Sequence, residues 1–224
     1  MKARRIFSAS RNVHGKRLEN CLDMPIQELL RIIQARTFET TYFGVLAVKN
    51  PLDFWTYQEI VFDLKPAVIV EIGTQIGGTA LALAHMLDHI GQGVVISVDL
   101  DHSKVPNLVK SHPRIKLVTG DACERFSSVR GVCAGRMPVM VIEDSSHTYD
   151  NTLNVLRKYG AIITRGSYFI VEDGICHHGL EAGPKPGPYE AVEQFLRENA
   201  DFEVDRSKEA YLITWNPKGY LRRK

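Results

Sequence analysis

From residue 67 onward, short apolar runs alternate with longer amphipathic segments. The apolar runs are rich in β-branched residues and stop at a glycine or an acid: AVIVEIG (67–73), VVISVD (94–99), IKLVTGD (115–121), PVMVIED (138–144) and SYFIVEDG (167–174). Runs of this kind are typical of strands buried on both faces of a sheet. Segments 79–90, 148–163 and 188–199 have helical spacing. The alternation predicts an α/β fold: a mostly parallel sheet with helices on both faces.

The two ends of the chain have different patterns. Residues 22–36 place apolar side chains on one helical face, and residues 53–64 predict a second helix that ends before Pro66. Near the other end, 202–205 (FEVD) and 210–216 (AYLITWN) predict a closing antiparallel pair of strands. We therefore expect a basic arm and helical segment over 1–50 and a sheet domain over 51–224.

Composition narrows the class of protein. The chain has 224 residues, of which 44% are hydrophobic and 24% charged, as in ordinary globular domains. No apolar run approaches the roughly 18 residues of a membrane span, and the first 15 residues lack the apolar core of a secretory signal. The four cysteines show no CxxC spacing, which favours free thiols. We expect a cytoplasmic protein that is not integral to a membrane.

The charge is unevenly distributed. Residues 1–17 contain six bases and no acid, so the other residues carry 22 bases and 26 acids, a net charge of −4. An acidic body of this kind does not favour binding to a nucleic-acid backbone. We expect the basic start to be a flexible arm, with contact to a neighbouring subunit as the first alternative and contact with nucleic acid as the last.

Each of the five predicted buried strands ends in at least one carboxylate. In parallel α/β sheets, ligands bind beyond the carboxyl ends of the strands, so these acids should meet at one rim. The alternative is that they are ordinary solvated loop acids. The acids at the five strand ends are Glu71, Asp99 with Asp101, Asp121, Glu143 with Asp144, and Glu172 with Asp173.

A glycine-containing turn follows the first of these strands. The segment EIGTQIGG (71–78) is neither GxGxxG nor a P-loop, because Gln75 holds the place of the second glycine and no P-loop lysine is present. A carboxylate at Asp99 can accept both ribose hydroxyls of a nucleoside, and Asp121 can accept an adenine amino group. The short turn and modest length favour S-adenosylmethionine over a dinucleotide.

A second group of polar residues follows the fourth and fifth strands. The carboxylates of Asp144, Glu172 and Asp173 would repel one another unless a proton or cation lies between them, and hard oxygen ligands suit Mg²⁺ or Ca²⁺. His147, three residues after Asp144, could act as a general base. The alternatives are a polar network without metal and a histidine that only packs. A zinc site at 176–178 (CHH) is conceivable, but we favour loop histidines there.

Several segments together resemble the cephalosporin hydroxylase family, whose members are S-adenosylmethionine-dependent methyltransferases. The resemblance spans about residues 42–223. The matching segments are KNPLDFWTYQEIVFDLKP, VEIGTQIGG, ISVDLDH, VTGDA, EDSSHTYDNTL, YFIVEDG, GPYEAVEQFL and FEVDRSKEAYLITWNPKGYLRRK. The ending NPKGYLRR is the most specific of these.

The resemblance implies a Rossmann-like class I methyltransferase: a seven-stranded, mostly parallel sheet of order 3-2-1-4-5-7-6 with one antiparallel strand. The implied Mg²⁺ ligands are Asp144, Glu172 and Asp173. The site is similar in layout to that of catechol O-methyltransferase, which has a catalytic lysine where this chain has His147. Family members assemble as homo-oligomers. The implied cofactor contacts are Glu71, Gly73, Thr74, Gly77, Gly78, Asp99, Asp121, Ala122 and Asp144.

We therefore predict an S-adenosylmethionine-dependent, divalent-metal-dependent O-methyltransferase that acts on a hydroxyl of a small polyhydroxylated acceptor, either a sugar moiety or a natural product. Asp144 and His147 would be its catalytic residues, with His147 removing the hydroxyl proton. One alternative is hydroxylation or methoxylation of a β-lactam, although the iron-binding His-x-Asp/Glu pattern is missing. Another is a non-catalytic protein that only binds S-adenosylmethionine.

Overall fold

The computed structural model describes residues 16–178 and 185–224. Its main feature is a seven-stranded sheet of order β5-β4-β3-β6-β7-β9-β8, in which β9 runs opposite to the other six strands. The predicted order and the single antiparallel strand are confirmed. The strands are β3 (Val68–Ile72), β4 (Val94–Asp99), β5 (Ile115–Thr119), β6 (Val139–Glu143), β7 (Tyr168–Val171), β8 (Phe202–Val204) and β9 (Tyr220–Arg223).

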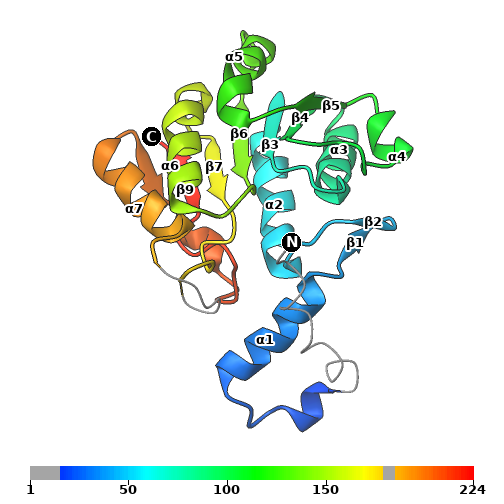
Figure 1. Ribbon diagram of the computed structural model, residues 1–224, viewed down its shortest axis with the longest axis vertical. Helices are drawn as coiled ribbons and strands as arrows, with labels where there is room; N and C mark the ends of the chain where they lie inside the picture. Colours follow the sequence, from blue (N-terminus) through cyan, green and yellow to red (C-terminus); the bar gives the residue numbers. More distant parts are fainter. Residues whose placement is uncertain (1–15, 179–184) are drawn as a thin grey trace.

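Helices cover both faces of the sheet, as predicted (Figure 1). One face packs against α2 (Pro51–Leu64), α3 (Gly78–Ile90) and α4 (Asn107–Lys110), and the other against α5 (Ala122–Cys133), α6 (Tyr149–Tyr159) and α7 (Pro188–Glu198). The sequence patterns did not predict α4 or α5. Every residue of β3 and β6 is buried, because both faces of these strands are covered.

The parallel strands end at nearly the same level. Ile72 at the end of β3 pairs with Val98 on one side and Glu143 on the other, and Asp99 pairs with Thr119. The loops that follow β3, β4, β5, β6 and β7 therefore leave the sheet along one edge. This register brings the acids at the strand ends together.

The prediction of a strand over residues 210–216 is wrong. That segment forms no strand, and the chain instead enters the sheet at β9, between β7 and β8. The reason is a side chain on α2: the Asp53 carboxylate accepts a hydrogen bond from the backbone N–H of Trp215 at 2.8 Å. This contact holds the segment against α2, so Trp215 lies beside the ends of the strands instead of within the sheet.

The chain before α2 has two differently packed parts. Helix α1 (Ile26–Thr37) starts after Pro25, four residues later than expected, and extends away from the sheet (Figure 1). It is followed by a hairpin of β1 (Thr41–Tyr42) and β2 (Val45–Leu46), which packs against α3. The expected basic arm lies almost wholly outside the described residues.

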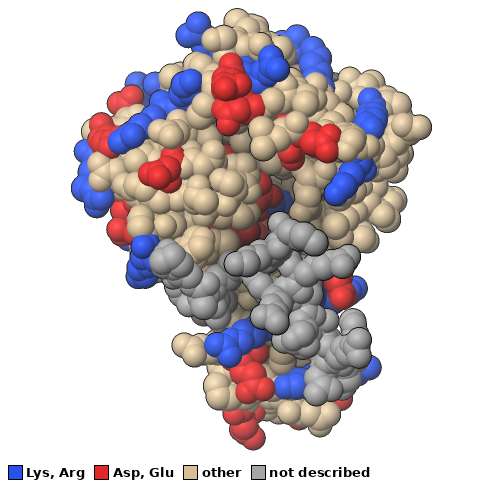
Figure 2. Space-filling model, in the orientation of Figure 1, with Lys and Arg blue, Asp and Glu red and all other residues tan. Residues whose placement is uncertain are grey.

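Lys, Arg, Asp and Glu are interspersed over the face drawn in Figure 2, without one large patch of either sign. Among the described residues, no helix combines the length and the apolar character that crossing a membrane requires.

Candidate active site

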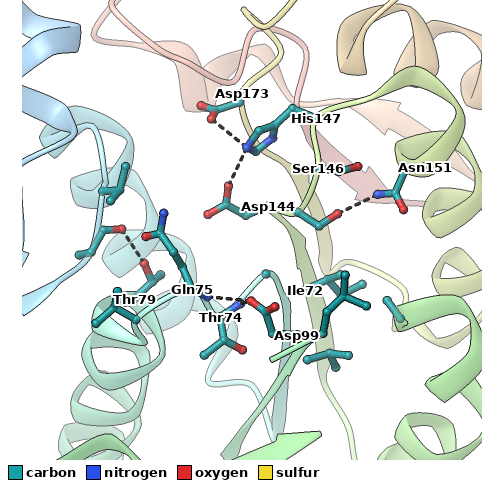
Figure 3. A pocket seen from close by; sticks show the side chains of 18 of the residues that line it. Ile72, Thr74, Gln75, Thr79, Asp99, Asp144, Ser146, His147, Asn151 and Asp173 are labelled. Carbon is teal, nitrogen blue, oxygen red and sulfur yellow. Dashed lines mark hydrogen bonds and ion pairs between the residues drawn. The ribbon is translucent and has the colours of Figure 1, made fainter. Parts of the chain in front are cut away.

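A cavity of about 780 Å³ lies at the carboxyl ends of the parallel strands. It brings together most of the residues singled out from the sequence, together with residues of the hairpin and of α1. Figure 3 shows the acids and His147 converging on it from several loops. The predicted site residues that line it are Gly73, Thr74, Asp99, Asp121, Ala122, Asp144, His147 and Asp173.

The turn after β3 is held by Asp99. Oxygen Oδ2 of Asp99 accepts hydrogen bonds from the backbone N–H groups of Thr74 at 2.9 Å and Gln75 at 2.8 Å. Gly73 has a φ of +103°, and a Cβ there would lie 1.9 Å from the carbonyl oxygen of Asp144. Only glycine fits that position, because two strand ends approach each other closely. The Asp99 carboxylate thus orders the turn and also faces the cavity.

Three other predicted cofactor contacts do not line the cavity. Gly78 lies beneath the hairpin, where a Cβ would come within 2.5 Å of the carbonyl oxygen of Leu46. Gly77 faces Val109 of α4. Glu71 is buried in the sheet, where it accepts a hydrogen bond from Ser97 Oγ. These residues support the residues that line the cavity, without lining it themselves.

Three buried glutamates carry raised pKa values. Burial raises the pKa of Glu172, the nearby charge of Asp144 adds to the rise, and Lys49 opposes it. Burial raises the pKa of Glu71 to about 8, although the Ser97 hydrogen bond opposes the rise. Burial likewise raises the pKa of Glu143 to about 7. Oxygen Oε1 of Glu143 accepts hydrogen bonds from Ser145 Oγ at 2.7 Å and Asn151 Nδ2 at 3.2 Å. Glu71 is therefore mostly neutral at pH 7.

His147 lies between two carboxylates (Figure 3). Its Nε2 atom is 3.4 Å from Oδ2 of Asp173 and 3.8 Å from Oδ1 of Asp144. His147 and Asp173 both have positive φ, at +53° and +52°. Such backbone strain in residues other than glycine concentrates at functional sites. The predicted approach of His147 to the acids is confirmed.

Lys49 is the main residue of the site that the strand-end pattern missed. Its side chain is 5% exposed and its ammonium forms ion pairs with both Asp144 and Glu172. Burial disfavours the charge, but the two carboxylates outweigh this and raise the pKa of Lys49 above its ordinary value. Glu172 does not line the cavity. The available signal was one basic residue inside the apolar stretch before α2, which does not reveal its partners.

The other predicted residues are placed as follows. Asp121 caps α5, where its Oδ1 accepts a hydrogen bond from the N–H of Glu124 at 3.0 Å, and Ala122 opens that helix. Residues Cys176 to His178 form no metal-binding group among the described residues. His178 instead stacks on Tyr189 and contacts Glu190 at 2.9 Å.

The strand order and the acid-lined cavity at the strand ends define a Rossmann-like methyltransferase. The model of one family, Rhamnosyl O-methyltransferase/CmcI, matches residues 34–224. The Rhamnosyl O-methyltransferase of Mycobacterium leprae is 31% identical over 194 residues, which cover 83% of each chain. The chain belongs to the Rhamnosyl O-methyltransferase/CmcI family, in agreement with the resemblance seen in the sequence.

Solved structures have the same fold. A structure of CmcI with Mg and SAM aligns with a TM-score of 0.66 at 23% identity, covering 83% of this chain and 76% of that one. An apo-structure of CmcI aligns with a TM-score of 0.65 at 26% identity, covering 82% and 76%.

Proposed function

We propose that the protein is an S-adenosylmethionine-dependent, divalent-metal-dependent O-methyltransferase that methylates a hydroxyl of a sugar moiety or a natural product. The observation that carries this proposal is the single cavity that Asp99 and Asp121 line together with Asp144, His147 and Asp173. A nucleoside-binding pair of acids and an acid–histidine group are thereby held in one space. The relatives named for rhamnosyl O-methylation support a sugar hydroxyl as the acceptor.

The cofactor side of the cavity is formed by the turn after β3 and the ends of β4 and β5. Oδ2 of Asp99 already holds the turn, while Oδ1, which accepts the N–H of Asp101 at 3.3 Å, keeps acceptor capacity for the ribose hydroxyls. Asp121 and Ala122 at the start of α5 line the cavity, and we propose that they contact the base. Gly73 and Thr74 offer backbone close to the methionine end, while Glu71, Gly77 and Gly78 support them.

The residues on the acceptor side fit a hard divalent cation. Asp144, His147 and Asp173 offer ligand atoms that all lie within 4.8 Å of one another, and Glu172 Oε1 beside them is buried without a hydrogen-bond partner. We therefore propose Asp144, Asp173 and Glu172 as the carboxylates that hold Mg²⁺. When bound, Mg²⁺ supplies a Lewis acid for the acceptor hydroxyl, and S-adenosylmethionine supplies a methyl group that is already activated.

The residues of the chain orient the acceptor and move its proton. Nε2 of His147 would accept the hydroxyl proton, and the carboxylates of Asp144 and Asp173 stabilise the imidazolium that forms. Because the cofactor and acceptor sides share one cavity, the walls hold the two reacting groups close and aligned. Leu46 of the hairpin lines one wall of that cavity.

We also infer a homo-oligomer that works in the cytoplasm on a small-molecule acceptor, without nucleic acid. Helix α1 and the turn before it leave Leu22 and Ile26 exposed at 74% and 62%, which supports contact with a second copy of the chain. The free thiols of Cys21, Cys123 and Cys133 support the cytoplasmic location. Light scattering of the purified chain measures its assembly.

The test of the function is transfer of an isotope-labelled methyl group from S-adenosylmethionine to a panel of glycosides, with rhamnosides included. We expect an O-methylated product that disappears in chelator and returns with Mg²⁺. Absence of methyl transfer to every hydroxyl acceptor would contradict the activity, and full turnover in chelator would remove the metal from it. Binding of S-adenosylmethionine without turnover on any acceptor would instead support a non-catalytic binding protein.

A further inference from the structure

Both the backbone and the side chain of Lys49 form hydrogen bonds that fix its position in the site. Its N–H donates to Thr40 Oγ1 at 2.8 Å, and that hydroxyl is 3.1 Å from the carbonyl oxygen of Lys49. Asn50, the next residue, caps α2 by accepting from the N–H of Leu52 at 3.1 Å. The hairpin on one side and the helix on the other therefore set the position from which the lysine side chain enters the protein.

The ammonium of Lys49 forms ion pairs with Asp144 and Glu172. The other acid nearby, Asp53, has its own donors: the backbone N–H of Trp215 at 2.8 Å, Tyr220 Oη at 2.9 Å and a threonine hydroxyl. Asp53 is satisfied without the lysine. Glu172 has no other hydrogen-bond donor among the described residues, and its second oxygen is unpartnered.

The charged residues form two layers. The outer layer, Asp144, His147 and Asp173, lines the cavity, whereas the inner layer, Lys49 and Glu172, does not. Asp144 joins the layers, because its Oδ2 contacts Lys49 while its Oδ1 lies 3.8 Å from His147. The lysine therefore fixes the direction in which the Asp144 carboxylate faces the cavity.

The charges of the two layers are complementary to one divalent cation. Counted as ions, the three carboxylates and the ammonium carry a net charge of −2; burial and Asp144 raise the pKa of Glu172, and Lys49 opposes that rise. Without the ammonium, two buried or half-buried carboxylates would lose their cationic partner, and an uncompensated buried charge is costly. A second cation would then be needed to keep the inner layer in place.

We propose that Lys49 is a positioning residue that serves as a permanent internal cation: it neutralises Glu172, aims Asp144 into the cavity, and keeps the site formed before any divalent cation enters. This inference rests on the proposed function for the identity of the site. It predicts that the wild-type fold is insensitive to chelator and that removal of Lys49 makes the fold depend on metal.

The test is thermal unfolding of the full chain in chelator and with Mn²⁺ as the metal probe, for wild type and Lys49→Met, which has nearly the same shape without the charge. We expect the unfolding midpoint of Lys49→Met in chelator to fall by roughly 6–15 °C. Saturating Mn²⁺ should raise that midpoint by at least about twice as many degrees as it raises the wild-type midpoint. Lys116→Met, an exposed change on β5, is the matched control and should behave as wild type.

The double variant Lys49→Met/Glu172→Gln separates charge from packing. If the lysine acts by neutralising Glu172, the double variant should recover more than half of the midpoint lost in chelator. In the extreme form of this result, Lys49→Met does not fold but the double variant does. Equal midpoints of Lys49→Met and wild type, no recovery in the double variant, or failure of both variants to fold would overturn the proposal. Methyl transfer is not measured here, so its absence would bear on the function alone.

Discussion

His147 is the residue on which the proposed proton transfer depends. We expect His147→Ala to lower turnover by roughly 10²–10⁴-fold, because a positioned base contributes about that much. Affinity for S-adenosylmethionine, measured by calorimetry, should change little, since the ring lies between Asp144 and Asp173 on the acceptor side. His89→Ala, an exposed change on α3, is the control. Normal turnover in His147→Ala would assign the proton to another group.

Glu71 makes stability depend on pH. Its pKa is raised from 4.5 to about 8 in the folded chain, so the folded state holds a proton that the unfolded state releases above pH 4.5. This contribution is fully present below pH 4.5 and is lost as pH rises through about 8. We compare the free energy of unfolding of Glu71→Gln with that of wild type. Between pH 5 and pH 8 this difference should shift by roughly 3 kcal/mol in favour of the variant. Urea unfolding at both values measures it, and parallel pH profiles of the two proteins would contradict it.

The sequence identified the acids and His147 because strand ends in a parallel sheet share one rim. It could not identify Lys49 as the partner of Asp144 and Glu172, since that pairing joins residues 95 and 123 positions apart. Nor could spacing alone separate Asp173, which faces the cavity, from its neighbour Glu172, which does not. Neighbouring residues after a strand point in different directions, and only the packing decides which direction faces the cavity.

At the scale of elements, the contact between the hairpin and α3 shapes one wall of the cavity. A Cβ on Gly78 would lie 2.5 Å from the carbonyl oxygen of Leu46, which is backbone and cannot rotate away. We expect Gly78→Ala to lower the free energy of unfolding by roughly 1–3 kcal/mol and to weaken cofactor binding. Gly131→Ala, in a helix with open space around it, should be neutral or stabilising. Chemical denaturation of both variants checks this, and equal stabilities would contradict the close contact.

Most elements were predictable because each buried strand is a short, β-branched run with a glycine or acid after it. The last strand was not. Residues 210–216 have the local pattern of a strand, but the Asp53 carboxylate accepts a hydrogen bond from the backbone N–H of Trp215. The strand of the sheet is instead β9, which lies further along the chain. Helix α5 was missed because its apolar residues are few and weakly periodic. In both cases the deciding contacts come from residues distant in the sequence.

At the scale of the whole molecule, a ligand that binds only the folded state must stabilise it. S-adenosylmethionine at about 100 times its Kd should add about 2.7 kcal/mol, which corresponds to roughly 5–10 °C in the unfolding midpoint. In Asp99→Asn the amide oxygen can still hold the turn, but its NH₂ cannot accept ribose hydroxyls. We expect that variant to lose more than half of the shift while its unliganded midpoint changes little. An undiminished shift would remove Asp99 from the cofactor site.

The position of β9 also determines what happens to an incomplete chain. Among the described strands, β8 pairs only with β9, and β9 also covers the side of β7 away from β6. In a polypeptide that stops before Tyr220, the backbone donors and acceptors along one edge of β7 are therefore unpaired. Segment β8 then has no strand to pair with. Exposed edges of this kind recruit other chains. Premature termination near the end of the message should thus yield an aggregating fragment that cellular proteases must clear, instead of a slightly shortened working enzyme.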